Sequence, residues 1–440
     1  MKLLSLTGRL AAPLALALTF LGAQAVEPTQ ANRKYANYYY AYPYPENPLP
    51  QLTAAPKGYE PFHIEHYGRH GSRWHIGSWV YRQPIDLLRP AERNGKLTPR
   101  GVELMKQLRK TEKQSRGRSG ELTPLGARQH RGIAERMTRN FPEIFKGDAN
   151  VDAKSTVVIR CVLSMENELR ALQAFNPDLN ITSDASGATM FYMNNENDSI
   201  TNAKVSSEAA KKALKEYKKD YPSDYSFIDL IISDPQFAKD SINIPELRSA
   251  LLRVTNNSQS LEEPTPTWDL FSEDALKEDA MRGDASWFIS YGNSDLTEGA
   301  APLRQRYLLY NMIESADTSI MSEKPSANLR FGHDVVVVPL VTLMDLDGYG
   351  RKVNDLNELD SFWHLYDLTP MATNVQMVFY RPKGRKYTAD DVLVKVLFNE
   401  KEVTLPAKKF NGPYYKWSDV RKAYLDKIGD TGLPPVQKDY

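Results

Sequence analysis

Compact apolar segments alternate along this chain with segments that begin like helices, and this alternation limits the possible folds more than any other feature. The clearest apolar segments cover residues 62–67, 155–159 and 374–380, and each has the length of a single strand. Strands that alternate with helices are typical of a central sheet covered by helices on both faces. We therefore expect an α/β fold: a three-layer sandwich with a mainly parallel central sheet and an inserted, mostly α-helical cap.

Two helix starts can be located from the sequence. Thr98-Pro99 and Thr123-Pro124 each place a residue that can cap a helix before a proline, whose missing N–H is not needed in the first turn. They predict helices over 98–110 and 123–140. Further helices are expected over 164–175, 208–219 and near 303–313.

Three of the predicted strands end at charged residues. The strand over 62–67 leads into Arg69-His70-Gly71-Ser72-Arg73, and the β-branched segment 155–159 predicts a buried strand that ends at Arg160. The segment 327–332 leads into His333-Asp334, where Asp334 begins a further helix. Near the C-terminus, 392–398 and 403–405 suggest a hairpin.

The N-terminus has the form of a secretory signal. Lys2 and Arg9 precede an apolar run over 10–21, and Ala23-Gln24-Ala25 matches a signal-peptidase site. A membrane anchor is the alternative, but the run is too short to cross a bilayer comfortably. We therefore expect a signal peptide over 1–25 and a mature chain that starts near Val26.

The rest of the chain divides by composition. A Tyr- and Pro-rich stretch over 26–57 lacks helical or strand periodicity and is expected to be an extended arm that lies on the domain. The α/β core is expected over 58–185 and 326–440. Between them, Asn-rich loops and aromatic-spaced helices predict the α-helical cap over 186–325.

Charge and cysteine content exclude several classes of function. The 56 basic and 55 acidic side chains nearly cancel, so no global field recruits nucleic acid or an anionic membrane. No later segment is apolar enough to span a membrane. Cys161 is the single cysteine, so no intrachain disulfide can form. An exported chain without disulfides fits a bacterial periplasm or cell surface better than a eukaryotic secretory route.

The charged turns contain the residue types that phosphoryl transfer requires. Ligands of open α/β sheets bind beyond the carboxyl ends of the strands, so we expect the three turns to converge there. Arginine offers permanently charged donors to phosphate oxygens, and a neutral imidazole can attack phosphorus to form a covalent intermediate. A carboxylic acid can protonate the leaving oxygen. Gly71 would let the backbone approach the phosphate closely.

These motifs resemble the histidine phosphatase superfamily, in its acid phosphatase and phytase branch. The resemblance covers about 58–180 and 325–385, and it includes Leu122-Thr123-Pro124-Leu125-Gly126 before Gln129-His130. It implies that His70 is the nucleophile, that Asp334 is the proton donor, and that the phosphate is held by Arg69, Arg73, Arg160 and His333. The chain is also similar to the multiple inositol polyphosphate phosphatases, which typically have His-Ala-Glu where this chain has His333-Asp334-Val335.

The resemblance implies an exported acid phosphatase that hydrolyses small organic phosphate esters, with inositol phosphates such as phytate among the candidates. No cofactor or metal is expected. His63, His66 and His75 lie near the signature, but no cysteine or acidic cluster completes a metal site, so structural or rim roles are expected. A phosphotransferase or mutase on the same scaffold, and a binding protein that holds phosphate esters without turnover, are the alternatives.

Overall fold

The computed structural model describes residues 30–43, 49–195, 199–322 and 324–429, so the predicted signal peptide lies outside the described residues. The chain folds around one mixed sheet, in the order β3-β2-β4-β1-β5-β6-β9-β8, with β7 paired to β6. The strands are β1 (Tyr59–Arg69), β2 (Asn150–Ser155), β3 (Asn180–Asp184), β4 (Ser326–Gly332), β5 (Asn374–Pro382), β6 (Leu393–Phe398), β7 (Lys401–Glu402), β8 (Lys409–Asn411) and β9 (Tyr414–Lys416).

The four strands β3, β2, β4 and β1 are parallel, and the pairs from β1 onward to β8 are antiparallel. Side chains along β5 alternate between the two faces as a pleated strand requires: Val375, Met377 and Phe379 pack on one side, and Val378 and Tyr380 on the other. Both faces are therefore buried, as a sheet covered by two helical layers demands.

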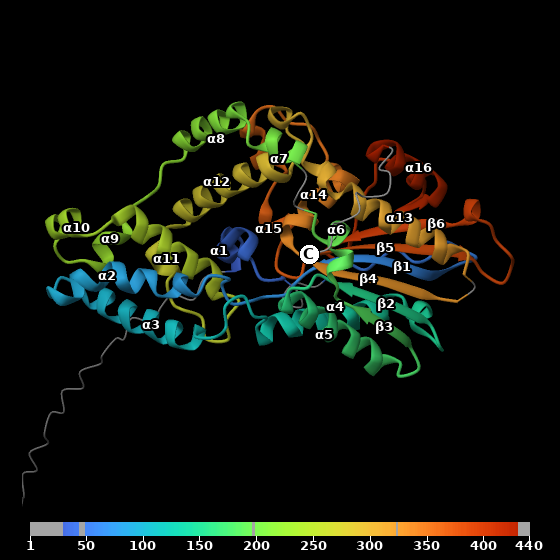
Figure 1. Cartoon of the computed structure of the whole chain (residues 1–440), viewed down its shortest axis with the longest axis horizontal. Helices are drawn as coiled ribbons and strands as arrows, with labels where there is room; N and C mark the ends of the chain where they lie inside the picture. Colours follow the sequence, from blue (N-terminus) through green and yellow to red (C-terminus); the bar gives the residue numbers. More distant parts are fainter. Residues whose placement is uncertain (1–29, 44–48, 196–198, 323, 430–440) are drawn as a thin grey trace, which may run out of the picture.

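Helices cover both faces of this sheet (Figure 1). One layer contains α13 (Arg306–Ile320), α14 (Asp334–Met344) and α16 (Trp417–Ile428), and the other contains α4 (Pro124–Asn140) and α5 (Ile159–Phe175). The predicted three-layer α/β class is thus confirmed, with parallel pairing in the core strands. Thr98 and Thr123 cap α3 (Pro99–Ser115) and α4 through their side-chain oxygens, as the sequence predicted.

A helical region extends from one end of the sandwich (Figure 1). Its helices are α2 (Gln83–Arg93), α3, α8 (Glu208–Asp220), α9 (Phe227–Ile231), α10 (Pro235–Ser241), α11 (Ile244–Ser258) and α12 (Glu273–Tyr291). One apolar cluster joins α2 and α3 to α9 and α11 through side chains such as Leu88, Leu104, Ile231 and Leu251. Short helices complete the fold: α6 (Met190–Met193), α7 (Ser199–Val205) and α15 (Leu365–Leu368).

Two local predictions need correction. Residues 30–39 are mostly helical rather than extended: α1 (Gln30–Arg33) continues into a 3-10 helix, η1 (Lys34–Tyr39), which is kinked at Asn37, where φ is 62°. The strand predicted over 155–159 is wrong, because β2 ends at Ser155 and α5 begins at Ile159. In the described part of the chain, no helix is both long and apolar enough to cross a membrane.

Candidate active site

The parallel pairing of β1, β4 and β2 gathers three chain segments at one edge of the sheet. Arg69, the last residue of β1, lies opposite Gly332 in β4, and Ser155 lies opposite Phe331. The backbone N–H of His70 donates to the Gly332 carbonyl at 2.9 Å. The segments after Arg69, Ser155 and Gly332 therefore leave the sheet side by side, at its carboxyl edge.

The His70 ring is fixed in one orientation. Its Nδ1 lies 2.9 Å from the Gly71 carbonyl oxygen, which can only accept, so Nδ1 donates and Nε2 keeps its lone pair. The side chain is 1% exposed. Burial first, and then the charges of Arg69, Arg160 and Arg73, hold the pKa of His70 well below its ordinary value. The result is a neutral imidazole surrounded by guanidinium groups.

Arg69 and Asp334 form an ion pair at the centre of the site. Arg69 Nη2 donates to Asp334 Oδ2 at 2.6 Å, while Asp334 Oδ1 accepts the N–H of Val335 at the start of α14. Burial lowers the pKa of Arg69 to about 10. Burial also raises the pKa of Asp334, but Arg69, Arg73 and His333 outweigh it, and the net direction is downward. Without substrate, these charges therefore favour the ionised form of the Asp334 carboxyl.

His333 follows β4 and precedes α14, opposite His70. The two ring centroids are 5.8 Å apart with an interplanar angle of 71°. Thr156 Oγ1 lies 3.1 Å from His333 Nε2, and Cys161 Sγ lies 3.8 Å from both ring nitrogens. Burial, followed by the charge of Arg160, lowers the pKa of His333 to about 4. Thr156 was missed from the sequence because it was assigned to the interior of a strand.

Arg160 lies in the first turn of α5, not at the end of a strand. Its positive charge is among those that lower the pKa of both His70 and His333. A Cβ built on Gly120 would be 3.5 Å from Arg160 Nη1, so the loop over 116–122 passes close to this guanidinium. Cys161 beside it is fully buried, as expected, and burial raises the pKa of its thiol to about 11.

Arg73 is 5% exposed and lies beside the same loop, where it forms an isolated bridge with Leu122. Its Nη1 donates to the Trp74 carbonyl at 3.2 Å, and its guanidinium lies over the ring of Tyr39, 5.3 Å from the centroid. The charge of Arg73 contributes to the lowered pKa values of Asp334 and His70. All six residues named from the sequence therefore interact with at least one other member of the set.

Gly71 permits a close contact with helix α4, in addition to the approach to phosphate that the sequence suggested. A Cβ at Gly71 would lie 2.5 Å from the backbone oxygen of Gly126, and a Cβ at Gly126 would lie 2.2 Å from the Ser72 oxygen. Both distances are too short for any side chain, so α4 packs directly on the loop after His70. Gln129 in α4 also exchanges two hydrogen bonds with Ser72, at 2.8 and 3.0 Å.

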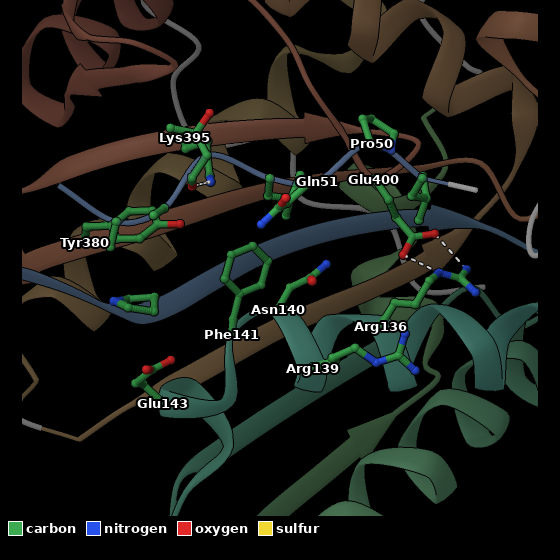
Figure 2. A pocket seen from close by; sticks show the side chains of 16 residues that line it. Pro50, Gln51, Arg136, Arg139, Asn140, Phe141, Glu143, Tyr380, Lys395 and Glu400 are labelled. Atoms are coloured by element: carbon green, nitrogen blue, oxygen red, sulfur yellow. Dashed lines mark hydrogen bonds and ion pairs between the residues drawn. The ribbon is translucent and has the colours of Figure 1, made fainter. Parts of the chain in front are cut away.

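A separate cavity of about 600 Å³ lies at the C-terminal end of α4 (Figure 2). It contains Arg136, Arg139 and Lys395, but none of the six residues named above. Glu400 forms two hydrogen bonds with Arg136, and Glu402 pairs with Lys395, so two of the three cations are already neutralised. Cations that are already paired make a poor phosphate site. Within the described residues, no cluster of three or more His, Cys, Asp or Glu side chains could hold a metal ion.

Comparison with known proteins identifies one family. The family model "Histidine phosphatase superfamily (branch 2)" matches residues 68–399, well over half of the chain. No curated protein matches the sequence. Multiple inositol polyphosphate phosphatase from Bifidobacterium longum, in complex with inositol hexasulfate, is similar in structure with a TM-score of 0.72 and 17% identity, covering 89% of this chain and 97% of that chain.

Two phytases are also similar. The enzyme from D. castellii has a TM-score of 0.63 and 15% identity, with 94% of this chain and 90% of that chain covered. The apo form of the Hafnia alvei phytase has a TM-score of 0.51 and 13% identity, with 86% and 98% covered. At these identities the likeness establishes a shared fold.

Proposed function

Because this chain belongs to branch 2 of the histidine phosphatase superfamily, and is therefore a phosphoric monoester hydrolase, we propose that it acts through a phosphohistidine on His70. The observation that carries the proposal is the hydrogen bond from His70 Nδ1 to the Gly71 carbonyl. It leaves Nε2 unprotonated and free to attack phosphorus, in a site where burial and three arginines keep the ring neutral.

The remaining residues have distinct roles in this proposal. Arg69, Arg73, Arg160 and His333 hold the phosphoryl oxygens and stabilise the charge that spreads over them in the transition state. His70 Nε2 forms a bond to phosphorus as the ester P–O bond breaks, and Asp334 gives its proton to the leaving oxygen. Asp334 then takes a proton from water, which displaces the phosphoryl group from His70 and restores the neutral imidazole.

We propose inositol polyphosphates as the substrate class. The similar structures include an inositol polyphosphate phosphatase and two phytases, which supports this class at the level of the fold. Two further cations lie beside neighbours of Arg73. The Arg118 guanidinium is 6.0 Å from the ring centroid of Trp74, and Arg253 acts after burial and Arg73 among the causes that lower the pKa of His75 to about 4. A ligand with several phosphates gains from such extra guanidinium groups, whereas a simple monoester does not.

The experiment compares phosphate release from inositol hexakisphosphate and from nitrophenyl phosphate at acidic pH. We expect wild type to hydrolyse both and His70→Ala to lose roughly 10³-fold or more on both, as for the removal of other catalytic nucleophiles. His364→Ala, a matched change outside the site, should retain activity on both. Activity that survives in His70→Ala would refute the nucleophile, and a wild type that cleaves nitrophenyl phosphate alone would refute the substrate class.

We also propose export from a bacterial cell, on the basis of the charged, apolar and small-residue regions before Val26. N-terminal sequencing of the protein from the producing cell shows whether the segment before Val26 has been cleaved. A first residue near Val26 supports export, and a retained Met1 contradicts it.

A further inference from the structure

Residues 30–43 of the N-terminal arm are fixed between the helical region and the α/β core. Asn37 Nδ2 donates to the Ala280 carbonyl in α12 at 3.1 Å, and the Tyr40 carbonyl accepts the N–H of Met371 at 2.7 Å. A Cβ at Gly283 would lie 2.1 Å from Asn37 Nδ2, so α12 approaches the arm as closely as glycine permits. These contacts leave the two residues after Asn37 little freedom to move.

The first of these residues, Tyr38, contacts Arg69 through its backbone. Arg69 Nη1 donates to the Tyr38 carbonyl at 2.7 Å and to the Thr369 carbonyl at 2.6 Å, while its Nη2 pairs with Asp334. Carbonyl oxygens orient a guanidinium without cancelling its charge. The Tyr38 ring stacks on Trp287 of α12, with centroids 5.1 Å apart, which holds the carbonyl in place.

The second residue, Tyr39, lies against Arg73. The Arg73 guanidinium is 5.3 Å from the Tyr39 ring centroid. The His75 ring stacks on Tyr39, with centroids 5.6 Å apart. Arg73 has few other restraints: one hydrogen bond to the Trp74 carbonyl, and a buried Nε with no hydrogen-bond partner among the described residues. The ring of Tyr39 is therefore a principal contact that fixes the plane of this guanidinium.

We propose that Tyr38 and Tyr39 are positioning residues for Arg69 and Arg73, two of the proposed phosphate-binding residues, and that the arm completes the active site through them. The Tyr38 carbonyl orients Arg69, and the Tyr39 ring supports Arg73. This inference rests on the proposed phosphatase function and extends it to a segment outside residues 68–399, which the family model matches. It also gives a catalytic-site role to the tyrosine-rich arm, for which the sequence favoured packing on the domain over stacking on sugars.

The test measures binding of inorganic phosphate by calorimetry and its inhibition of turnover. Tyr39→Leu removes the ring and should weaken phosphate binding about 2- to 30-fold, the range expected for loss of a cation–π contact. Tyr39→Phe keeps the ring and should bind within about 2-fold of wild type. Tyr35→Leu makes the same change at an arm tyrosine that contacts Lys34 instead, and should bind as wild type does.

The outcomes separate the arm from the rest of the mechanism. Wild-type affinity in Tyr39→Leu would overturn the inference, and an equal loss in Tyr39→Phe would assign the effect to the hydroxyl and overturn the role of the ring. Tyr39 is buried, so melting is followed in parallel, and Tyr39→Met replaces Tyr39→Leu if the latter unfolds. Calorimetry needs no turnover. A catalytically inactive wild type that still binds phosphate would therefore refute the proposed function, while the effect of Tyr39 on phosphate binding could still be measured. A wild type that binds no phosphate would refute both.

Discussion

At the scale of single residues, the protonation state of Asp334 must change when substrate binds. The free protein favours the ionised carboxylate, whereas the proposed proton donor is the protonated acid. Arg69, Arg73 and His333 together lower its pKa below the ordinary value, although burial acts in the opposite direction. A general acid must carry a proton. A phosphate dianion that binds to the same arginines neutralises part of their charge, which removes the main cause of the low pKa and lets Asp334 take up a proton in the complex. Activity is therefore expected to favour acidic pH.

Asp334→Asn tests this role by comparing leaving groups. The variant should lose roughly 10²- to 10⁴-fold in kcat/KM on inositol hexakisphosphate, whose alkoxide needs a proton, but much less on nitrophenyl phosphate, whose phenolate does not. We compare kcat/KM because it covers only the steps up to release of the leaving group and leaves out the later hydrolysis of phosphohistidine, which both substrates share. Loss of the ion pair with Arg69 affects both substrates alike, so the difference between them isolates the proton transfer. Equal losses on the two substrates would contradict the role of Asp334 as the acid.

The sequence identified residues that lie within a motif and missed those that act from elsewhere. Arg69, His70 and Asp334 were predicted because each is adjacent to the end of a strand. Thr156 and Tyr39 carry no local signal, because their partners, His333 and Arg73, are distant in the sequence. The roles assigned to the predicted residues stay predictions until they are measured.

At the scale of elements, a buried acid–base pair joins α12 to α15. Asp284 in α12 is 4% exposed, accepts the N–H of Leu365 at 3.0 Å, and lies 3.4 Å from His364 Nδ1. Burial raises the pKa of Asp284 from 3.8 to about 6. The pKa of His364 is also raised, because Asp284 outweighs the effect of burial. Each group therefore keeps its proton up to a higher pH in the folded state than in the unfolded chain.

This pair predicts that stability falls as pH rises from about 4 to about 7. Stability decreases wherever the folded state binds more protons than the unfolded state. One unit of pKa shift corresponds to about 1.4 kcal/mol, so ionisation of the Asp284 carboxyl alone lowers the free energy of unfolding by about 3 kcal/mol over this range. Asp284→Asn should flatten the slope of unfolding free energy against pH, whereas Asp274→Asn, at an exposed carboxylate in the first turn of α12, should not. An unchanged slope in Asp284→Asn would exclude this pair as its cause.

The error at 155–159 shows why element boundaries were harder to predict than element types. The segment is β-branched, yet Val157 and Ile159 are more than half exposed, because β2 ends at Ser155 and the chain turns into α5. The true strand alternates buried and partly buried residues over Asn150–Ser155, a weaker signal that the branched residues obscured. The capped helix starts were accurate because Thr98 and Thr123 act through local hydrogen bonds alone.

At the scale of the whole molecule, the sheet explains how distant segments form one site. Parallel pairing of β1, β4 and β2 places their carboxyl ends together, which a pattern of strands and helices could predict. The antiparallel pairing from β5 onward could not be predicted, because it depends on the order of the strands in the sheet, which the sequence does not supply. The division into a core over 58–185 and 326–440 and a cap over 186–325 stays a prediction, since α2 and α3 share an apolar cluster with α9 and α11.

The most direct test of the central claim is to trap the covalent intermediate. Wild type and Asp334→Asn are mixed with labelled nitrophenyl phosphate, quenched under denaturing, non-acidic conditions that preserve phosphohistidine, and the labelled peptide is identified by mass spectrometry. We predict a phosphoryl group on His70 in both proteins, at higher occupancy in Asp334→Asn, where water is activated more slowly, and none in His70→Ala. Turnover by wild type without label on His70, or label on another residue, would contradict the account.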